Sequence, residues 1–106
     1  MRSIDFNRAD RLSDQIRDEI SFILSREVKD PRLTGLTIII VELSKDIKKA
    51  FIFFSSSNSF NETKLEDELL GLKKAKGFVR RQLGKRLNIK RVPDISFQED
   101  YSDHLL

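Results

Sequence analysis

The sequence predicts an α+β fold in which two helices cover one face of a three-stranded sheet. Two segments, at about residues 8–28 and 61–87, repeat apolar residues at helical spacing. Three shorter segments, at about residues 36–43, 49–55 and 95–101, are rich in β-branched or aromatic residues. The order is therefore helix, strand, strand, helix, strand, and the simplest packing places both helices on the same side of the sheet.

The first helix is predicted over about Arg8–Val28, because its apolar residues share one face and its charged residues fall elsewhere on the helical wheel. These apolar positions are Leu12, Ile16, Ile20, Ile23, Leu24 and Val28. We expect the helix to stop before Asp30-Pro31, since a residue that precedes proline is pushed out of the helical conformation.

Two strands and a tight turn are predicted next. Leu36–Leu43 is rich in β-branched residues and predicts the first strand. Ser44–Lys48 is predicted to be a turn that contains Asp46, and a second strand follows over about Lys49–Ser55. Two neighbouring strands with a short polar link predict an antiparallel hairpin.

Alternation assigns the side chains of the second strand to two faces. Ala50, Ile52 and Phe54 point to one face, and Phe51 and Phe53 point to the other. If the helices cover only the first face, the two rings lie on the open face. There they would serve as a protein contact or as a platform on which bases stack. The alternative is that the two rings pack against the ends of the chain.

The second helix is predicted to begin near Asn61, where Thr63–Glu66 has the pattern of a capping box. Its apolar stripe comprises Leu65, Leu69, Leu72, Ala75, Val79, Leu83 and Leu87. Lys76 falls inside this stripe, where burial of its charge would be costly, and the weak helix former Gly77 follows it. We therefore predict a kink or break at Ala75-Lys76-Gly77 that turns Lys76 outward. A half-helix that starts near Gly77 would offer backbone N–H groups to an anion.

A short basic connection, Asn88–Arg91, is predicted to lead to Val92-Pro93. Ile95 and Phe97 then alternate with polar residues, which predicts a third strand up to about Tyr101. We expect one domain over residues 1–106, with an ordered core at about residues 8–101.

Composition limits the class of protein. A chain of 106 residues has room for one core, and eight phenylalanines help to fill it. The absence of cysteine excludes disulfides and cysteine-based zinc sites. The charged N-terminus does not have the pattern of a secretory signal, and no apolar run approaches the roughly 18 residues of a membrane span. We expect a cytoplasmic monomer with no membrane contact.

The sequence contains no catalytic motif. None of its four glycines lies in a phosphate-binding loop pattern. His104 is expected to be a solvated residue near the C-terminus, because no partner is positioned to make it a catalytic base. Glu66-Asp67-Glu68 could hold a magnesium ion, but adjacent carboxylates on a helix diverge, so a solvated first turn is expected. We therefore expect no enzyme, no cofactor and no metal.

The distribution of charge indicates an anionic partner. The net charge is only +3, yet residues 73–91 hold nine of the 20 basic residues and no acidic one. The remaining 11 basic residues oppose all 17 acidic ones, so the rest of the chain is net −6. Nucleic acid is the leading partner, and a solvated helix face is the alternative. The predicted contacts are Lys73, Lys74, Lys76, Arg80, Arg81, Lys85, Arg86, Lys90 and Arg91. Phe78 either stacks on a base or belongs to the core.

Four short motifs follow one another in a characteristic order. They are Asp30-Pro31-Arg32-Leu33, Val41–Asp46, Ala75–Arg81 and Pro93–Phe97. In this order they resemble the ribosome-binding factor A family of bacteria, and the likeness covers about Arg8–Asp100. The resemblance implies a type II KH-like fold with the element order given above.

Ordinary KH domains grip single-stranded nucleic acid with a GxxG loop between two helices. This chain, like the family it resembles, has Ala75-x-Gly77 there as an interhelical kink, so a sequence-specific grip on four nucleotides is not expected. Many family members carry a longer C-terminal extension. Functions attributed to such a tail are not expected here.

The resemblance implies an assembly factor that binds free small ribosomal subunits and their rRNA. It would assist late subunit maturation and rRNA processing without catalysis. Two alternatives stay open: a general KH-like RNA-binding regulatory module, and a protein-interaction domain that uses Phe51 and Phe53. Loss of RNA affinity with salt is expected of the two RNA-binding functions, because only they neutralise phosphates.

Overall fold

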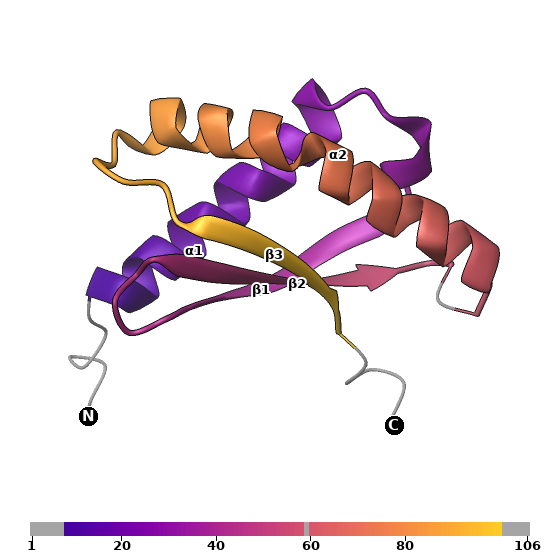
Figure 1. The fold of residues 1–106 in the computed structure, drawn as a ribbon, viewed down its shortest axis with the longest axis horizontal. Helices are drawn as coiled ribbons and strands as arrows, with labels where there is room; N and C mark the ends of the chain where they lie inside the picture. The colour runs from indigo at the N-terminus through magenta and orange to yellow at the C-terminus, as the bar shows by residue number, and fades with distance from the viewer. Residues whose placement is uncertain (1–7, 59, 101–106) are drawn as a thin grey trace.

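The computed structural model describes residues 8–58 and 60–100. Two helices lie on one face of a three-stranded sheet, and neither covers the other face (Figure 1). The strands are β1 (Leu36–Leu43), β2 (Lys49–Ser56) and β3 (Asp94–Glu99), in the spatial order β1-β2-β3. The pair β1–β2 is antiparallel, as predicted, and β2–β3 is parallel. The predicted α+β class and element order are confirmed; Tyr101 and His104 lie outside the described residues.

The first helical segment consists of two kinds of helix. α1 (Arg8–Phe22) is an α-helix, and Ile23–Glu27 continues it as one π-helical turn. The Val28 N–H donates to the Ile23 carbonyl over 2.9 Å, and Val28 itself is extended. The predicted end near Val28 is therefore correct, but a single regular helix to that point is not, because the last hydrogen bond spans five residues instead of four.

The open face of the sheet carries the two predicted rings. Phe51 and Phe53 are half-buried, whereas Ala50, Ile52 and Phe54 on the helical face are fully buried. A bulge between Ile38 and Ile40 shifts the register, so that Ile40 pairs with Phe53. Ile40 is 46% exposed. An apolar strip therefore lies on the face that the helices leave free.

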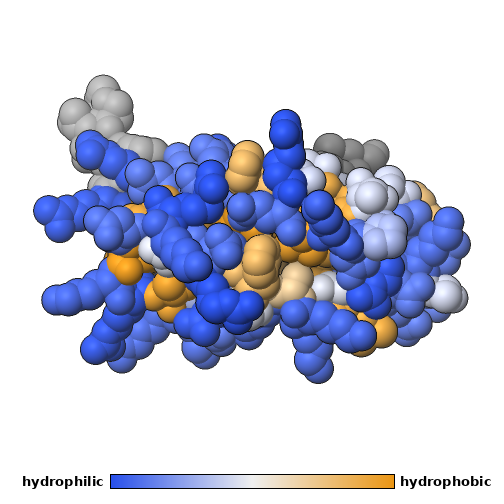
Figure 2. Space-filling view, turned by 90° about the horizontal axis from the view of Figure 1, so that it is seen from above, coloured by the Kyte–Doolittle hydropathy of each residue, from blue (hydrophilic) through white to orange (hydrophobic). Residues whose placement is uncertain are grey.

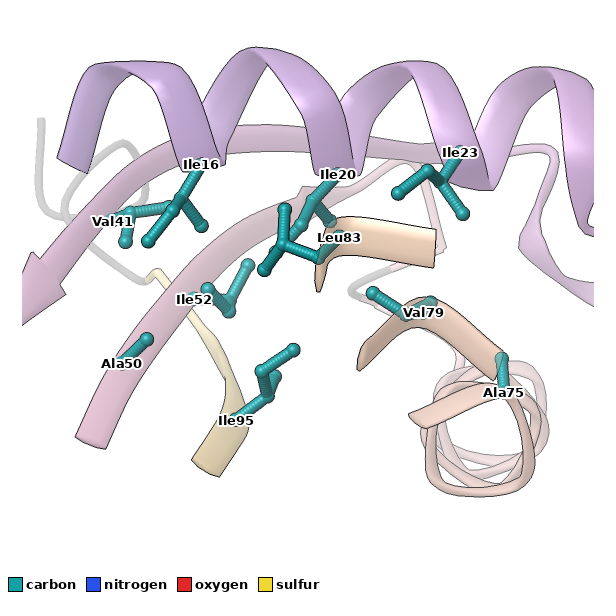
Figure 3. Close-up of a cluster of buried hydrophobic side chains, with 10 residues drawn as sticks. All are labelled: Ile16, Ile20, Ile23, Val41, Ala50, Ile52, Ala75, Val79, Leu83 and Ile95. Atoms are coloured by element: carbon teal, nitrogen blue, oxygen red, sulfur yellow. The ribbon is translucent and has the colours of Figure 1, made fainter. Parts of the chain in front are cut away.

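The core forms where both helices meet the sheet. Figure 3 shows side chains from the first helical segment, the three strands and the second helix converging between these layers. This main core comprises Ile16, Ile20, Ile23, Val41, Ala50, Ile52, Ala75, Val79, Leu83 and Ile95. A smaller cluster of Leu33, Phe54 and Leu72 extends the packing.

α2 (Glu62–Leu87) begins at an asparagine cap and not at the predicted capping box. The Asn61 side chain accepts a hydrogen bond from the Lys64 N–H over 3.1 Å. Asn61 is extended, which suits an N-cap, whereas Thr63 already lies within the helix. The helix ends at Asn88, which adopts the left-handed conformation with φ of 53°.

Of the predicted kink or break at Ala75-Lys76-Gly77, the break is wrong, because α2 is helical without interruption through these residues. Figure 1 shows that α2 changes direction near its middle, so the bend occurs within an unbroken helix. The expected cost of a buried Lys76 charge does not arise: its ammonium reaches sideways to Asp94. No helix N-terminus exists at Gly77, and the predicted anion site there is absent.

Glu68 takes a place that the sequence pattern assigned to solvent. Its side chain is buried and accepts hydrogen bonds from Ser56 Oγ over 2.5 Å and from Asn58 Nδ2 over 2.9 Å. Leu69, expected in the apolar stripe, is 40% exposed. The start of α2 is therefore rotated toward the end of β2, because Ser56 and Asn58 offer two donors to this carboxylate.

Candidate RNA-binding surface

The nine predicted basic residues lie along the last two-thirds of α2 and in the α2–β3 connection, residues 88–93. Figure 2 shows the helical side of the molecule, where hydrophilic side chains cover most of the surface and project from one end. The structure thus brings the nine residues onto one helix and its following loop. It divides them into two groups by what their charged atoms contact.

Six of the nine cations are exposed, and their charged groups make no hydrogen bond or ion pair with any residue that the structure describes. We call them the free cations: Lys73, Lys74, Arg81, Lys85, Lys90 and Arg91. Their charges are available to a partner. Phe78, on the same helix, is half-buried against the main core, so its proposed base stacking stays a prediction.

Lys76 is the first of three cations that the fold engages. Its Nζ lies 3.0 Å from Asp94 Oδ1, and the two side chains are 37% and 60% exposed. Donation by Lys76 holds the pKa of the Asp94 carboxyl below its ordinary value, and the nearby Arg80 charge acts in the same direction. Lys76 is therefore partly exposed, in the outward direction predicted, but Asp94 holds its ammonium at the edge of the sheet.

Arg80 is the second engaged cation. Its Nε donates to the Pro93 carbonyl over 3.1 Å, and its Nη2 donates to the Val92 carbonyl over 2.9 Å. The guanidinium thus satisfies two backbone acceptors of the α2–β3 connection with one planar group. Arg80 positions the residues that lead into β3.

Arg86 is the third engaged cation, and it joins the two helices. Its Nε donates to Glu19 Oε1 on α1, and its guanidinium carbon lies 4.3 Å from the centre of the Phe22 ring. An ion pair and a cation–π contact therefore act on the same side chain. Both contacts hold the C-terminal half of α2 against α1.

A groove of about 330 Å³ lies between α2 and β3, beside the bend of the helix. Leu72 and Phe97 contribute apolar walls, and Lys73 and Lys76 stand on the helical side. A cationic rim over apolar walls suits a polyanion that carries planar bases. Sequence patterns did not reveal this groove, because it depends on β3 lying beside α2.

Sequence reasoning also missed how α2 packs against the 3-10 helix Pro31–Leu33 that follows the π-helical turn. Asp30 and Arg32 form an ion pair with 2.7 Å between Oδ2 and Nη2, and donation from the Arg32 side chain lowers the Asp30 pKa to about 2. Gly71 of α2 is buried against this pair. A Cβ at Gly71 would lie 3.1 Å from both Asp30 Oδ2 and Leu33 Cδ2, so glycine allows the close approach.

The described residues contain neither a metal centre nor a membrane-spanning helix. Over residues 8–58 and 60–100, no three side chains of His, Cys, Asp or Glu gather in a way that could hold a metal ion. In the same ranges, no helix combines the length and apolar character required to cross a membrane.

Comparison with known proteins identifies the family. The model of ribosome-binding factor A matches residues 8–104, which include both helices, all three strands and the whole basic stretch. The chain belongs to the ribosome-binding factor A family. The ribosome-binding factor A of Syntrophus aciditrophicus (strain SB) is 45% identical over 98 residues, which cover 92% of this chain and 77% of that protein.

Solved structures of ribosome-binding factor A share this fold. The solution NMR structure from Thermotoga maritima has a TM-score of 0.78 at 31% identity, over 92% of this chain and 91% of that one. A Thermus thermophilus homology model, fitted into a cryo-EM map of a complex of the 30S subunit with ribosome-binding factor A, has a TM-score of 0.67. It is 24% identical and covers 86% of this chain and 93% of that one, which shows likeness of fold.

Proposed function

We propose that the protein is a non-catalytic assembly factor that binds free small ribosomal subunits in the cytoplasm and assists their late maturation and rRNA processing. It acts as a monomer whose α2 and α2–β3 connection contact rRNA. Membership of the ribosome-binding factor A family carries the proposal. The fold likeness to the Thermus thermophilus protein placed on its 30S subunit supports it.

The free cations supply the affinity in this proposal. Six exposed positive charges over 19 residues, with no acidic residue among them, favour contact with several phosphates at once. The groove beside Lys73 and Lys76 gives an unstacked nucleotide a place to lie. Arg80 and Arg86 contribute chiefly by holding the shape of this surface. The ammonium of Lys76 is held by Asp94 beside the groove.

The experiment measures binding to purified small subunits across a salt series. The test variant replaces Lys74, Arg81 and Lys85 with Gln. The slope of log K against log salt should become shallower by about 2, at roughly 0.7 for each lost phosphate contact. The matched control replaces Arg11, Arg26 and Lys64 with Gln. These three exposed basic residues lie elsewhere, so the control changes the net charge by the same amount as the test variant. An equal loss of small-subunit affinity in the two variants would show that this surface is not the RNA contact.

Sedimentation of cell extract distinguishes an assembly factor from a general RNA-binding module. An assembly factor should migrate with free small subunits and be absent from translating ribosomes. A module that binds RNA in general should spread over many ribonucleoprotein fractions. A crosslinking map on the purified subunit would then show which rRNA segments α2 touches.

A protein contact through the open face of the sheet is the second candidate function. The observation that favours it is the apolar strip of Ile40 and Phe53, with Ile40 46% exposed. Binding of this kind should respond little to salt. Replacement of Ile40 with Thr would weaken it and leave the salt-dependent RNA affinity intact.

A further inference from the structure

The tip of the β1–β2 hairpin, residues 44–49, presents an unusual combination of a tightly held backbone and exposed side chains. The Ile47 N–H donates to the Ser44 carbonyl over 2.9 Å, and the Ser44 N–H donates to the Lys49 carbonyl over 2.9 Å. The turn is thus closed by the backbone at both ends. We call these six residues the hairpin tip.

Two polar side chains lock this turn from within. Ser44 Oγ donates to Asp46 Oδ1 over 2.7 Å and accepts from the Lys49 N–H over 3.0 Å. The same Asp46 oxygen accepts from the Lys48 N–H over 3.0 Å. These donors hold the pKa of the Asp46 carboxyl below its ordinary value. The acidic side chain of the tip is therefore used to build the turn.

Ile47 occupies a backbone conformation that β-branched residues rarely adopt. Its φ is 59°, in the left-handed region where glycine or asparagine is usual after a turn of this kind. Its side chain is 37% exposed, so core packing does not explain the choice of residue. Strained positions that the surrounding hydrogen bonds enforce occur preferentially at functional sites.

Three lysines share the hairpin tip with Ile47. Lys45, Lys48 and Lys49 are all exposed and have no ion pair with a residue that the structure describes. The Asp94 N–H donates to the Lys48 carbonyl over 2.9 Å, so the tip lies directly beside the end of the α2–β3 connection. Lys90 and Arg91, two of the free cations, belong to that connection.

The two basic segments therefore lie at one end of the molecule. Figure 1 shows the β1–β2 loop and the α2–β3 connection at the same end of the sheet, and Figure 2 shows hydrophilic side chains projecting from that end. The sequence separates these segments by about 40 residues, and the parallel pairing of β2 with β3 brings them together.

We propose that the hairpin tip is a second RNA contact, in which Ile47 packs against a base or ribose face and Lys45, Lys48 and Lys49 bind phosphates on either side. The inference rests on the proposed function and extends its surface from α2 to the sheet. An apolar wedge flanked by cations fits a nucleic acid, whose apolar faces alternate with phosphates. Continuity with Lys90 and Arg91 favours RNA over an acidic protein, since one strand could cross both segments.

The test compares two hairpin variants with the wild-type chain on purified small subunits. Ile47→Asn removes the wedge and keeps a residue that tolerates positive φ, so its thermal unfolding midpoint should equal or exceed that of wild type. Its affinity for small subunits should fall about tenfold, because the variant no longer buries the exposed part of the isoleucine side chain against RNA. Replacement of Lys45, Lys48 and Lys49 with Gln should make the salt slope shallower by about 2.

The Lys-to-Gln changes spare the turn, because its hydrogen bonds use only backbone atoms of Lys48 and Lys49. The Arg11, Arg26 and Lys64 variant is again the control for net charge. Wild-type affinity and salt slope in both hairpin variants would overturn the hairpin contact and leave the proposed function standing. Absence of binding by the wild-type chain would overturn both.

Discussion

Lys76 Nζ and Asp94 Oδ1 lie 3.0 Å apart, so an ion pair joins the middle of α2 to the first residue of β3. The pair explains how a lysine next to the apolar stripe remains in an unbroken helix. Lys76 lines the groove together with Leu72 and Ile95, while its ammonium reaches a carboxylate at the sheet edge. The pair also shields one cation of the proposed RNA surface.

Asp94→Asn should therefore bind small subunits more tightly than wild type. The change removes a negative charge from the surface and releases Lys76 for a phosphate, so the salt slope should steepen by about 0.7. Lys76→Gln should weaken binding, and stability should change little in either variant, since both side chains are substantially exposed. Filter binding and urea unfolding measure the two effects. A loss of affinity in Asp94→Asn would mean that the pair serves the shape of the surface.

The two glycines of α2 near its bend should respond to alanine in opposite ways. Gly77 is exposed, and a Cβ there would meet only Arg81 Nη1 at 3.6 Å, an ordinary contact. Gly77→Ala should raise the free energy of unfolding by about 0.5–1 kcal/mol through helix propensity. Gly71→Ala should be less stable than Gly77→Ala by at least ~1 kcal/mol, because its Cβ would press on Asp30 and Leu33.

Urea unfolding of the two glycine variants provides the measurement, and circular dichroism checks helix content. A destabilised Gly77→Ala would show that the bend of α2 requires a glycine, as the sequence-based kink assumed. Unchanged small-subunit binding in Gly77→Ala is also expected, since the helix continues through this residue.

Local patterns were sufficient to predict most of the fold. The β-branched run predicted β1 at its observed bounds, and the alternation in β2 placed Phe51 and Phe53 on the open face. These features depend on residues close together in the chain. The π-helical turn and the buried Glu68 were not predictable in this way, because Glu68 finds Ser56 and Asn58 only after the sheet has formed.

The sequence was sufficient to predict the candidate site as a charged segment, but not to predict which of its cations are free to contact a partner. Counting charges identified nine cations, yet three of them hold the fold through partners distant in sequence. Arg86 meets Glu19 over 67 residues of chain, and no spacing rule predicts that contact. The hairpin lysines were not predicted for a related reason, since only the β2–β3 pairing brings them beside the α2–β3 connection.

Asp30 should make stability depend on acid pH. Donation from the Arg32 side chain, then from its backbone N–H, holds the Asp30 pKa at about 2, below the ordinary 3.8. The ionised form is therefore favoured in the folded state. Its contribution is fully present above pH 3.8 and is lost as the pH falls toward 2.

Two measurements test this dependence on pH. Carboxyl titration by NMR should show a low pKa for Asp30, and Arg32→Gln should return most of the shift while the backbone donor remains. The difference in unfolding free energy between wild type and Asp30→Asn should shrink on acidification through this range. If this difference in unfolding free energy stayed constant from pH 6 to pH 2, the Asp30–Arg32 pair would not be the source of the dependence on pH.

Arg80 and Arg81 are neighbours in sequence, but substitutions at the two positions should have different effects, one on stability and the other on binding. Arg80 donates to the carbonyls of Val92 and Pro93, so Arg80→Gln should lower the free energy of unfolding by about 1–3 kcal/mol. Arg81 is exposed without such partners, so Arg81→Gln should change stability by less than ~0.5 kcal/mol. Only Arg81→Gln should reduce small-subunit affinity while the unfolding transition stays in place.

Urea unfolding and salt-dependent binding, measured on both variants, decide between the two roles. Arg80→Lys serves as the control for charge, because it keeps the cation and loses the planar pair of donors. Destabilisation of Arg80→Lys with a preserved salt slope would support a positioning role for the guanidinium. A slope shallower by about 0.7 in Arg80→Gln at full stability would instead place Arg80 on phosphate and contradict its assignment to the α2–β3 connection.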